Sequence, residues 1–111
     1  MAEAGGKILI SGFKLEEEEK AIVNEVLESY VRKIEERFGF EEIMLRLKKS
    51  RRGKAFLHEV QGTLVSTNTG KQFKARVTDY NLFSALSEVF EKLMREAEHA
   101  QRTKRQMAKG K

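Results

Sequence analysis

The sequence predicts a two-layer α+β domain with the element order β-α-β-β-β-α, in which two helices cover one face of a four-stranded sheet. Three observations lead to this prediction. Apolar residues recur at three- and four-residue steps over residues 15–38 and again over 82–97. Apolar and polar residues alternate over 42–48 and 71–78, as in half-buried strands. The chain has 111 residues, enough for one hydrophobic core and too few for two.

The first strand is expected over residues 7–13, which begin with a short apolar run. Residues 15–38 are then expected to form a helix, which Gly39 ends at its C-terminus. One face of this helix is apolar and consists of Val23, Val26, Leu27, Tyr30, Ile34 and Phe38. The helix is long enough to cross over the sheet, so the first two strands are expected to be parallel.

The other strands are expected to follow as an antiparallel meander. The two alternating segments are the second and fourth strands, and residues 55–66 form the third. A basic connection, residues 48–54, is expected to be a loop between the second and third strands. The segment 67–70 (TNTG) predicts a hairpin turn, because Asn and Gly tolerate positive φ. Gly62 indicates a bulge or a point of close packing.

The last helix begins after Asp79 or Asn81, either of which can cap it. Its apolar stripe includes Leu82, Phe83, Leu86, Val89, Phe90, Leu93 and Ala97. We expect the helix to end near Gln101. The domain then covers residues 7–102, between a flexible N-terminus at 1–6 and a basic, disordered tail at 103–111.

Composition excludes several classes of protein. Charged residues make up 35% of the chain, and no apolar run approaches the roughly 18 residues that a membrane span needs. The chain contains no cysteine, which excludes disulfides, thiol nucleophiles and Cys-based zinc sites. We therefore expect a cytoplasmic protein without a membrane partner, monomeric when free.

Charge is distributed unevenly along the chain, whose net charge is +5. Residues 1–46 carry 11 acidic and 7 basic side chains, whereas residues 47–111 carry 6 acidic and 15 basic ones. Such asymmetry gives a small domain one basic side, and the commonest partner of such a side is a polyphosphate backbone. A solubilising surface with a basic tail is the alternative.

Cations on the two helices are candidates for RNA contact. Those of the last helix step by three, four and three residues, so they share one solvent-facing stripe: Lys92, Arg95, His99 and Arg102. Glu88 and Glu91 lie on the same side, and intrahelical ion pairs are the alternative. On the first helix, Lys33 and Arg37 lie four residues apart and flank the apolar face, with salt bridges to neighbouring Glu residues as the alternative.

Cations in the middle of the chain form two further candidates. The connection 48–54, between the second and third strands, is the densest basic cluster of the chain. It contains Lys48, Lys49, Arg51, Arg52 and Lys54. On a loop these cations could rearrange to meet phosphates; a solvated hairpin is the alternative. A broad cationic patch on the outer face of the sheet is expected from Arg46, Lys48, Lys74 and Arg76, unless the lysines only protect sheet edges. Lys104 and Arg105 in the tail complete the candidates.

Catalytic and metal sites are not indicated. His58 shares a strand face with Phe56 and Val60, so we interpret it as a core or boundary residue rather than a base. His58 and His99 lack metal-ligand spacing, and the acidic run 16–19 is typical of a solvated first helical turn. The sequence has no phosphate-cradling glycine motif and no nucleophile motif. We expect no enzyme activity, no cofactor and no small-molecule substrate.

Four segments of the sequence resemble the ribosome hibernation promoting factor family, whose short members include the ribosome-associated translation inhibitors. The segments are the opening strand 8–13 (ILISGF), the helix segment 30–38 (YVRKIEERF), the hairpin 62–78, and the last helix from NLFSAL to EKLMR over 81–95. The resemblance covers roughly residues 7–105. It rests on element order, spacing and basic positions together, and no single motif is diagnostic.

The resemblance implies a fold related to double-stranded RNA-binding domains. It also implies a function: family members bind the small ribosomal subunit in the channel of messenger RNA and transfer RNA, inhibit translation and protect the idle ribosome. The expected partners are therefore the small ribosomal subunit and its ribosomal RNA. A general double-stranded RNA-binding protein or RNA chaperone, not dedicated to ribosomes, is the alternative. A protein-interaction adaptor that uses the exposed sheet face is a third possibility.

Overall fold

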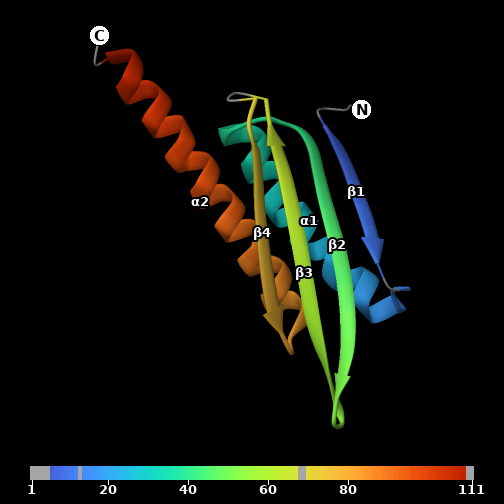
Figure 1. Ribbon diagram of the computed structural model, residues 1–111. Helices are drawn as coiled ribbons and strands as arrows, with labels where there is room; N and C mark the ends of the chain where they lie inside the picture. The colour runs from blue at the N-terminus through green and yellow to red at the C-terminus, as the bar shows by residue number, and fades with distance from the viewer. Residues whose placement is uncertain (1–5, 13, 68–69, 110–111) are drawn as a thin grey trace.

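The computed structural model describes residues 6–12, 14–67 and 70–109, except for the side chains of 103–109. The element order is β-α-β-β-β-α, as predicted. The elements are β1 (Lys7–Gly12), α1 (Glu17–Arg37), β2 (Phe40–Arg52), β3 (Ala55–Ser66), β4 (Gln72–Asp79) and α2 (Leu82–Lys109). Both helices lie on one face of the sheet (Figure 1), so the predicted two-layer α+β fold is confirmed.

The sheet has the strand order β1-β2-β3-β4. β1 pairs in parallel with β2, because α1 carries the chain from the end of β1 back to the start of β2. The remaining pairs are antiparallel. This order confirms the predicted crossover and meander, and it places β3 between β2 and β4. β1 is an edge strand, and its Ile8, Leu9 and Ile10 are all more than a third exposed.

Local contacts fix both ends of α1. At the start, the backbone N–H of Glu16 donates a 2.9 Å hydrogen bond to Oε1 of Glu19, a capping contact that the sequence pattern had not predicted. At the end, the N–H of Gly39 donates to the carbonyl of Ile34, and Gly39 adopts a φ of +68°. A left-handed glycine just after a helix is the usual way to turn the chain out of it, so the predicted stop is confirmed.

The core lies between the sheet and the two helices. The fully buried face of the sheet includes Ile43, Leu45, Val60 and Leu64. Helix α2 contributes the other large group of buried side chains, which includes Leu86, Val89, Phe90 and Leu93. Gly62 makes this contact possible, because a Cβ atom there would lie 2.5 Å from Cγ1 of Val89. Gly62 keeps its register between β2 and β4, so it is a point of close packing and not a bulge.

The hairpin between β2 and β3 is longer than predicted. The prediction of a loop over 48–54 is wrong, because β2 continues to Arg52 and every residue from 42 to 52 pairs with β3. Only Gly53 and Lys54 form the turn, with Gly53 at a φ of +63°. The composition of the segment is typical of a loop, but the paired backbone of β3 holds it extended.

Helix α2 is also longer than predicted. The helix end expected near Gln101 is wrong: α2 continues to Lys109, so 103–109 is helical rather than a disordered tail. This segment contains no glycine or proline until Gly110, and Lys, Arg, Gln, Met and Ala all favour helix. Its cations also suit the negative end of the helix dipole. Residues 1–5, expected to be flexible, lie outside the described residues.

Asn81 caps the start of α2, as one of the two predicted candidates. Its side-chain Oδ1 accepts a 2.9 Å hydrogen bond from the N–H of Ser84. Asp79 supports the cap, because its Oδ1 accepts a 2.8 Å bond from the N–H of Asn81. Neither helix has a stretch, over the residues described, that is long and apolar enough to cross a membrane.

Candidate nucleic-acid interface

The outer face of the sheet carries four cations, which we call the sheet patch: Arg46, Lys48, Lys74 and Arg76. The register places them on one face. Arg46 and Arg76 both lie opposite Gln61, and Lys74 lies opposite Thr63, which itself pairs with Met44 on β2. The helices cover the other face, so the sheet patch faces solvent (Figure 1). The predicted patch is confirmed as a structural feature, and its role in RNA binding stays a prediction.

The sheet patch borders a hollow of about 680 Å³ on the same face. Its lining combines three cations with the polar side chains of Ser11, Gln61 and Thr63 and the apolar side chains of Leu9 and Met44. Guanidinium, ammonium, amide and hydroxyl groups are the donors that commonly bind phosphate and sugar oxygens of nucleic acids. The hollow can therefore accept a phosphate backbone without reading its sequence.

Residues of β3 in the hollow were missing from the sequence-based candidates. Gln61 and Thr63 lie between the cations of β2 and β4, and all of them point to the same face. The signal was present in the alternation of 55–66, because Val60 and Leu64 identify the buried face and their neighbours the exposed one. A search for charged residues alone does not identify Gln61 and Thr63, because both are uncharged.

Ion pairing leaves most of the sheet patch available. Nη1 of Arg76 lies 3.4 Å from Oε2 of Glu59, its cross-strand diagonal neighbour. Within the described part of the chain, no carboxylate lies within ion-pair distance of Arg46, Lys48 or Lys74. Exposed ion pairs of the Arg76 kind contribute little free energy and are screened by salt, so a phosphate can compete for Arg76 as well.

The helix stripe, which we define as Lys92, Arg95, His99 and Arg102, lies on the exposed side of α2. All four side chains are exposed, and the buried side of α2 contacts β3 and β4 on the face away from the sheet patch. Arg102 makes an ion pair of 3.1 Å with Glu98, so the intrahelical alternative applies to this residue. Neither Lys92 nor Arg95 has an ion-pair partner among the side chains that the structure describes.

The sheet patch and the helix stripe therefore lie on opposite faces of the molecule. From one face of the molecule to the other, the sheet patch is followed by the sheet itself, then by α2, and then by the helix stripe on the far side of α2. The Cα atoms extend 57 × 32 × 18 Å, so the molecule is a thin slab. A flat RNA surface could contact only one of the two cationic surfaces at a time.

Lys33 and Arg37 lie on the side of α1 that contacts α2. Nζ of Lys33 is 5.1 Å from the ring centroid of Tyr30, and the Tyr30 hydroxyl donates a 2.7 Å hydrogen bond to Glu91 of α2. The carbonyl of Arg37 accepts a hydrogen bond of 3.4 Å from the side chain of Gln101. Both cations are exposed and border the helix layer, rather than the sheet patch.

Tyr30 also stacks on Phe90, with 5.3 Å between ring centroids. Burial, together with the neighbouring Glu91 carboxylate, raises the pKa of the Tyr30 hydroxyl above its ordinary value. The hydroxyl is therefore a hydrogen-bond donor at neutral pH, and the bond joins the two helices.

The basic cluster 48–54 divides between the two faces of the sheet. Lys48 and Arg52 lie on the outer face, whereas Lys49 and Arg51 lie on the helix side. Nζ of Lys49 is 3.0 Å from Oε2 of Glu19, and the Lys49 side chain is only 22% exposed. The expectation that these cations rearrange on a loop is wrong for the four that belong to β2, because the paired strand fixes their directions; Lys54 lies in the turn.

Glu19 joins this hairpin to α1. Burial by itself raises the pKa of Glu19, but the Glu16 N–H and Lys49 outweigh burial and lower it below the ordinary value. The carboxylate is therefore charged at neutral pH, and Lys49 has a structural role. Lys104 and Arg105 lie in the helical segment whose side chains are outside the described residues.

The described side chains include no group of three or more His, Asp or Glu residues that could hold a metal ion. His58 lies at the boundary of the core, where its Nδ1 is 3.0 Å from the carbonyl oxygen of Tyr80. The cations of the sheet patch and the helix stripe give both surfaces the charge needed to attract anions.

Comparison with solved structures identifies a protein of the same fold. The chain is similar to a ribosomal subunit interface protein from Coxiella burnetii, with a TM-score of 0.61 and 11% identity over 86% of this chain and 97% of that one. The N-terminal domain of Protein Y from Thermus thermophilus aligns over 86% of this chain and 98% of its own length, with 21% identity and a TM-score of 0.48. No protein-family model and no curated protein matches the sequence. The predicted β-α-β-β-β-α fold is thus shared with the Coxiella burnetii protein.

Proposed function

We propose that this protein is a ribosome hibernation factor of the short type. It binds the ribosomal RNA of the small subunit in the channel of messenger RNA and transfer RNA, inhibits translation and protects the idle ribosome. It acts in the cytoplasm, without catalysis and without a cofactor. The resemblance to the ribosome hibernation promoting factor family supports the proposal, as does the fold shared with a ribosomal subunit interface protein.

The observation that carries the proposal is the position of two cationic surfaces on opposite faces of a thin slab. A protein that rests on the outside of an RNA duplex needs cations on one side only. A protein that occupies a channel with RNA walls gains from cations on both sides. The sheet patch and the helix stripe meet this second requirement.

The proposed mechanism has two steps. The cationic surfaces first attract the particle and release counterions from its RNA, which makes binding strong at low salt and weaker as salt rises. The bound slab then excludes messenger RNA and transfer RNA sterically. Phosphate contacts orient the protein and carry no sequence information, so one protein can bind an RNA wall without a base-specific motif.

Co-sedimentation with purified small subunits tests the proposal. Three variants are compared with the wild type: one neutralises the sheet patch, one the helix stripe, and one replaces Lys14, Lys20 and Arg32 by Gln as a control. The control cations are exposed and lie outside both surfaces. We expect each surface variant to weaken binding and the control to bind like the wild type. Full binding by both surface variants would contradict the proposal.

A general RNA-binding protein is the second candidate, since it would use the same phosphate contacts. Competition separates the two functions. Initiator transfer RNA or messenger RNA should displace a channel binder from the small subunit, whereas a general RNA binder should be displaced equally well by any duplex of similar length. Equal displacement by an unrelated duplex would favour the second candidate.

A further inference from the structure

Exposed aromatic residues gather at one end of the molecule. Phe56, Tyr80 and Phe83 are 45%, 58% and 45% exposed. They are the only aromatic members among the large apolar side chains exposed in the described residues. We call this group the aromatic end. Exposed aromatic clusters are uncommon on a soluble domain and are typical of a binding surface.

Three separate elements bring the aromatic end together. Phe56 is the second residue of β3, next to the β2–β3 turn. Two residues further on, His58 pairs with Asp79, the last residue of β4, and Nδ1 of His58 is 3.0 Å from the carbonyl oxygen of Tyr80. Phe83 follows in the first turn of α2. The hairpin, the end of β4 and the start of α2 therefore meet.

Local contacts hold this end in place. Nζ of Lys49 is 5.1 Å from the ring centroid of Phe56 and 3.0 Å from a carboxylate oxygen of Glu19, so the ring packs against a fixed cation. On the other side, Asp79 accepts a hydrogen bond from the N–H of Asn81, which fixes the backbone on both sides of Tyr80. The rings are thus presented by an ordered backbone.

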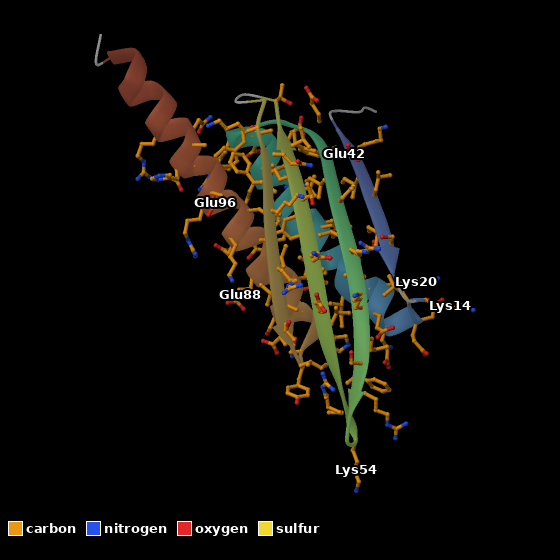
Figure 2. All side chains as sticks on the ribbon, viewed as in Figure 1. Lys14, Lys20, Glu42, Lys54, Glu88 and Glu96 are labelled. Atoms are coloured by element: carbon orange, nitrogen blue, oxygen red, sulfur yellow. The ribbon has the colours of Figure 1, made fainter. Side chains whose placement is uncertain are left out.

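Cations surround the aromatic end. Arg51, Arg52 and Lys54 lie at or beside the hairpin turn, and Figure 2 shows Lys54 projecting from the tip, away from both helices. Two of the nearby carboxylates are engaged by cations: Glu19 pairs with Lys49, and Glu59 pairs with Arg76. Aromatic rings beside exposed cations match the two needs of single-stranded nucleic acid, which are stacking for the bases and positive charge for the phosphates.

We propose that the aromatic end binds unpaired nucleotides of single-stranded RNA. Bases stack on the rings of Tyr80 and Phe83, and the cations of the hairpin tip bind the adjoining phosphates. Base-paired RNA cannot use the site, because its bases are stacked on one another. This inference rests on the proposed RNA-binding function and adds a ligand class to it. A protein partner with an acidic surface would bind here without any preference for bases.

Tyrosine fluorescence offers a direct test, because the chain has no tryptophan and two tyrosines. Tyr30→Phe keeps the ring that stacks on Phe90 and leaves Tyr80 as the single tyrosine. This variant is titrated with a single-stranded RNA of about ten nucleotides, with an abasic strand of the same length, and with the duplex. We expect the single strand alone to quench the emission. Equal quenching by the abasic strand or the duplex, or no quenching by any of them, would overturn the proposal.

Affinity and salt dependence provide a second readout. Tyr80→Ala and Phe83→Ala should each weaken single-strand binding by about five-fold or more, with no change in the slope of affinity against salt. Tyr80→Phe, the matched control, keeps the wild-type affinity. Arg52→Gln should lower the slope, because it removes a phosphate contact. Unchanged single-strand affinity in both alanine variants would overturn the proposal.

Co-sedimentation of the same proteins with small subunits separates this inference from the proposed function. Normal co-sedimentation without single-strand quenching would reject the aromatic end and leave the hibernation function standing. If the wild-type protein does not co-sediment with small subunits, the hibernation function is rejected. Quenching of Tyr80 fluorescence by single-stranded RNA would then still support the proposal for the aromatic end.

Discussion

Arg46 on β2 and Arg76 on β4 lie opposite the same residue of β3, Gln61. One row across the sheet thus carries two guanidinium groups, each two strand spacings from the other. Strands in a sheet are about 4.8 Å apart, so the backbones that carry the two arginines are about 10 Å apart. The spacing lets both contact one phosphate backbone that crosses the sheet.

Neutralising the sheet patch should weaken binding to small subunits and lower its salt dependence. The variant Arg46→Gln, Lys74→Gln, Arg76→Gln removes three phosphate contacts, so the slope of log affinity against log salt should fall by about 2 to 3. Filter binding at several salt concentrations measures the slope. An unchanged slope would mean that RNA does not touch this face.

Neutralising the helix stripe tests the opposite face. Lys92→Gln, Arg95→Gln, Arg102→Gln should also weaken co-sedimentation and flatten its salt dependence, by a similar amount. The matched control replaces Lys14, Lys20 and Arg32, which are exposed cations outside both surfaces. If the control variant weakens binding as much as the stripe variant, binding depends on net charge alone and the helix stripe is not a specific contact surface.

Gly62→Ala should destabilise the fold. The new Cβ atom would lie 2.5 Å from Cγ1 of Val89 and 3.1 Å from Cδ1 of Leu93, so α2 must shift away from the sheet. Overpacking of this kind costs about 1–3 kcal/mol of unfolding free energy, which urea denaturation measures. Adding Val89→Ala should recover part of the loss, and a purely additive double variant would show that the two sites do not touch.

Glu19→Gln should reduce stability at neutral pH and have little effect in acid. The folded protein lowers the pKa of Glu19 below its ordinary value of 4.5, so the carboxylate stabilises the fold above that pH and stops doing so as pH falls through the lowered pKa. The loss at pH 7 should be about 1 kcal/mol, as for other helix-capping groups.

The test compares denaturation of wild type and Glu19→Gln at pH 7 and pH 3. The difference between the two proteins should be largest at pH 7 and should shrink at pH 3. A Lys49→Met variant is the companion, because it removes the ion-pair partner and leaves the Glu16 contact in place. A difference that grows in acid would contradict the assigned direction of the pKa shift.

Periodicity was sufficient to predict the layers and the strand order. Alternation over 42–48 and 71–78 assigned Arg46 and Arg76 to the outer face, and the helical steps of α2 assigned Lys92 and Arg95 to one stripe. Such patterns reflect burial of one face, which is a property of the local sequence. The sheet patch and the helix stripe could therefore be predicted without the structure.

Contacts between distant residues could not be predicted in the same way. Arg51 and Arg52 belong to a segment with a loop-like composition, and only pairing with β3 makes it a strand. Lys49 was counted among the RNA-binding cations, yet it pairs with Glu19, thirty positions earlier in the chain. Ion pairs of this kind depend on tertiary packing, which no local pattern encodes.

Cell-free protein synthesis tests the central claim most directly. Purified protein, added in increasing amounts to a translating extract, should reduce synthesis, and excess initiator transfer RNA or messenger RNA added beforehand should restore it. The variant that lacks both the sheet patch and the helix stripe should leave synthesis unaffected. Undiminished synthesis with the wild-type protein in large excess would contradict the account.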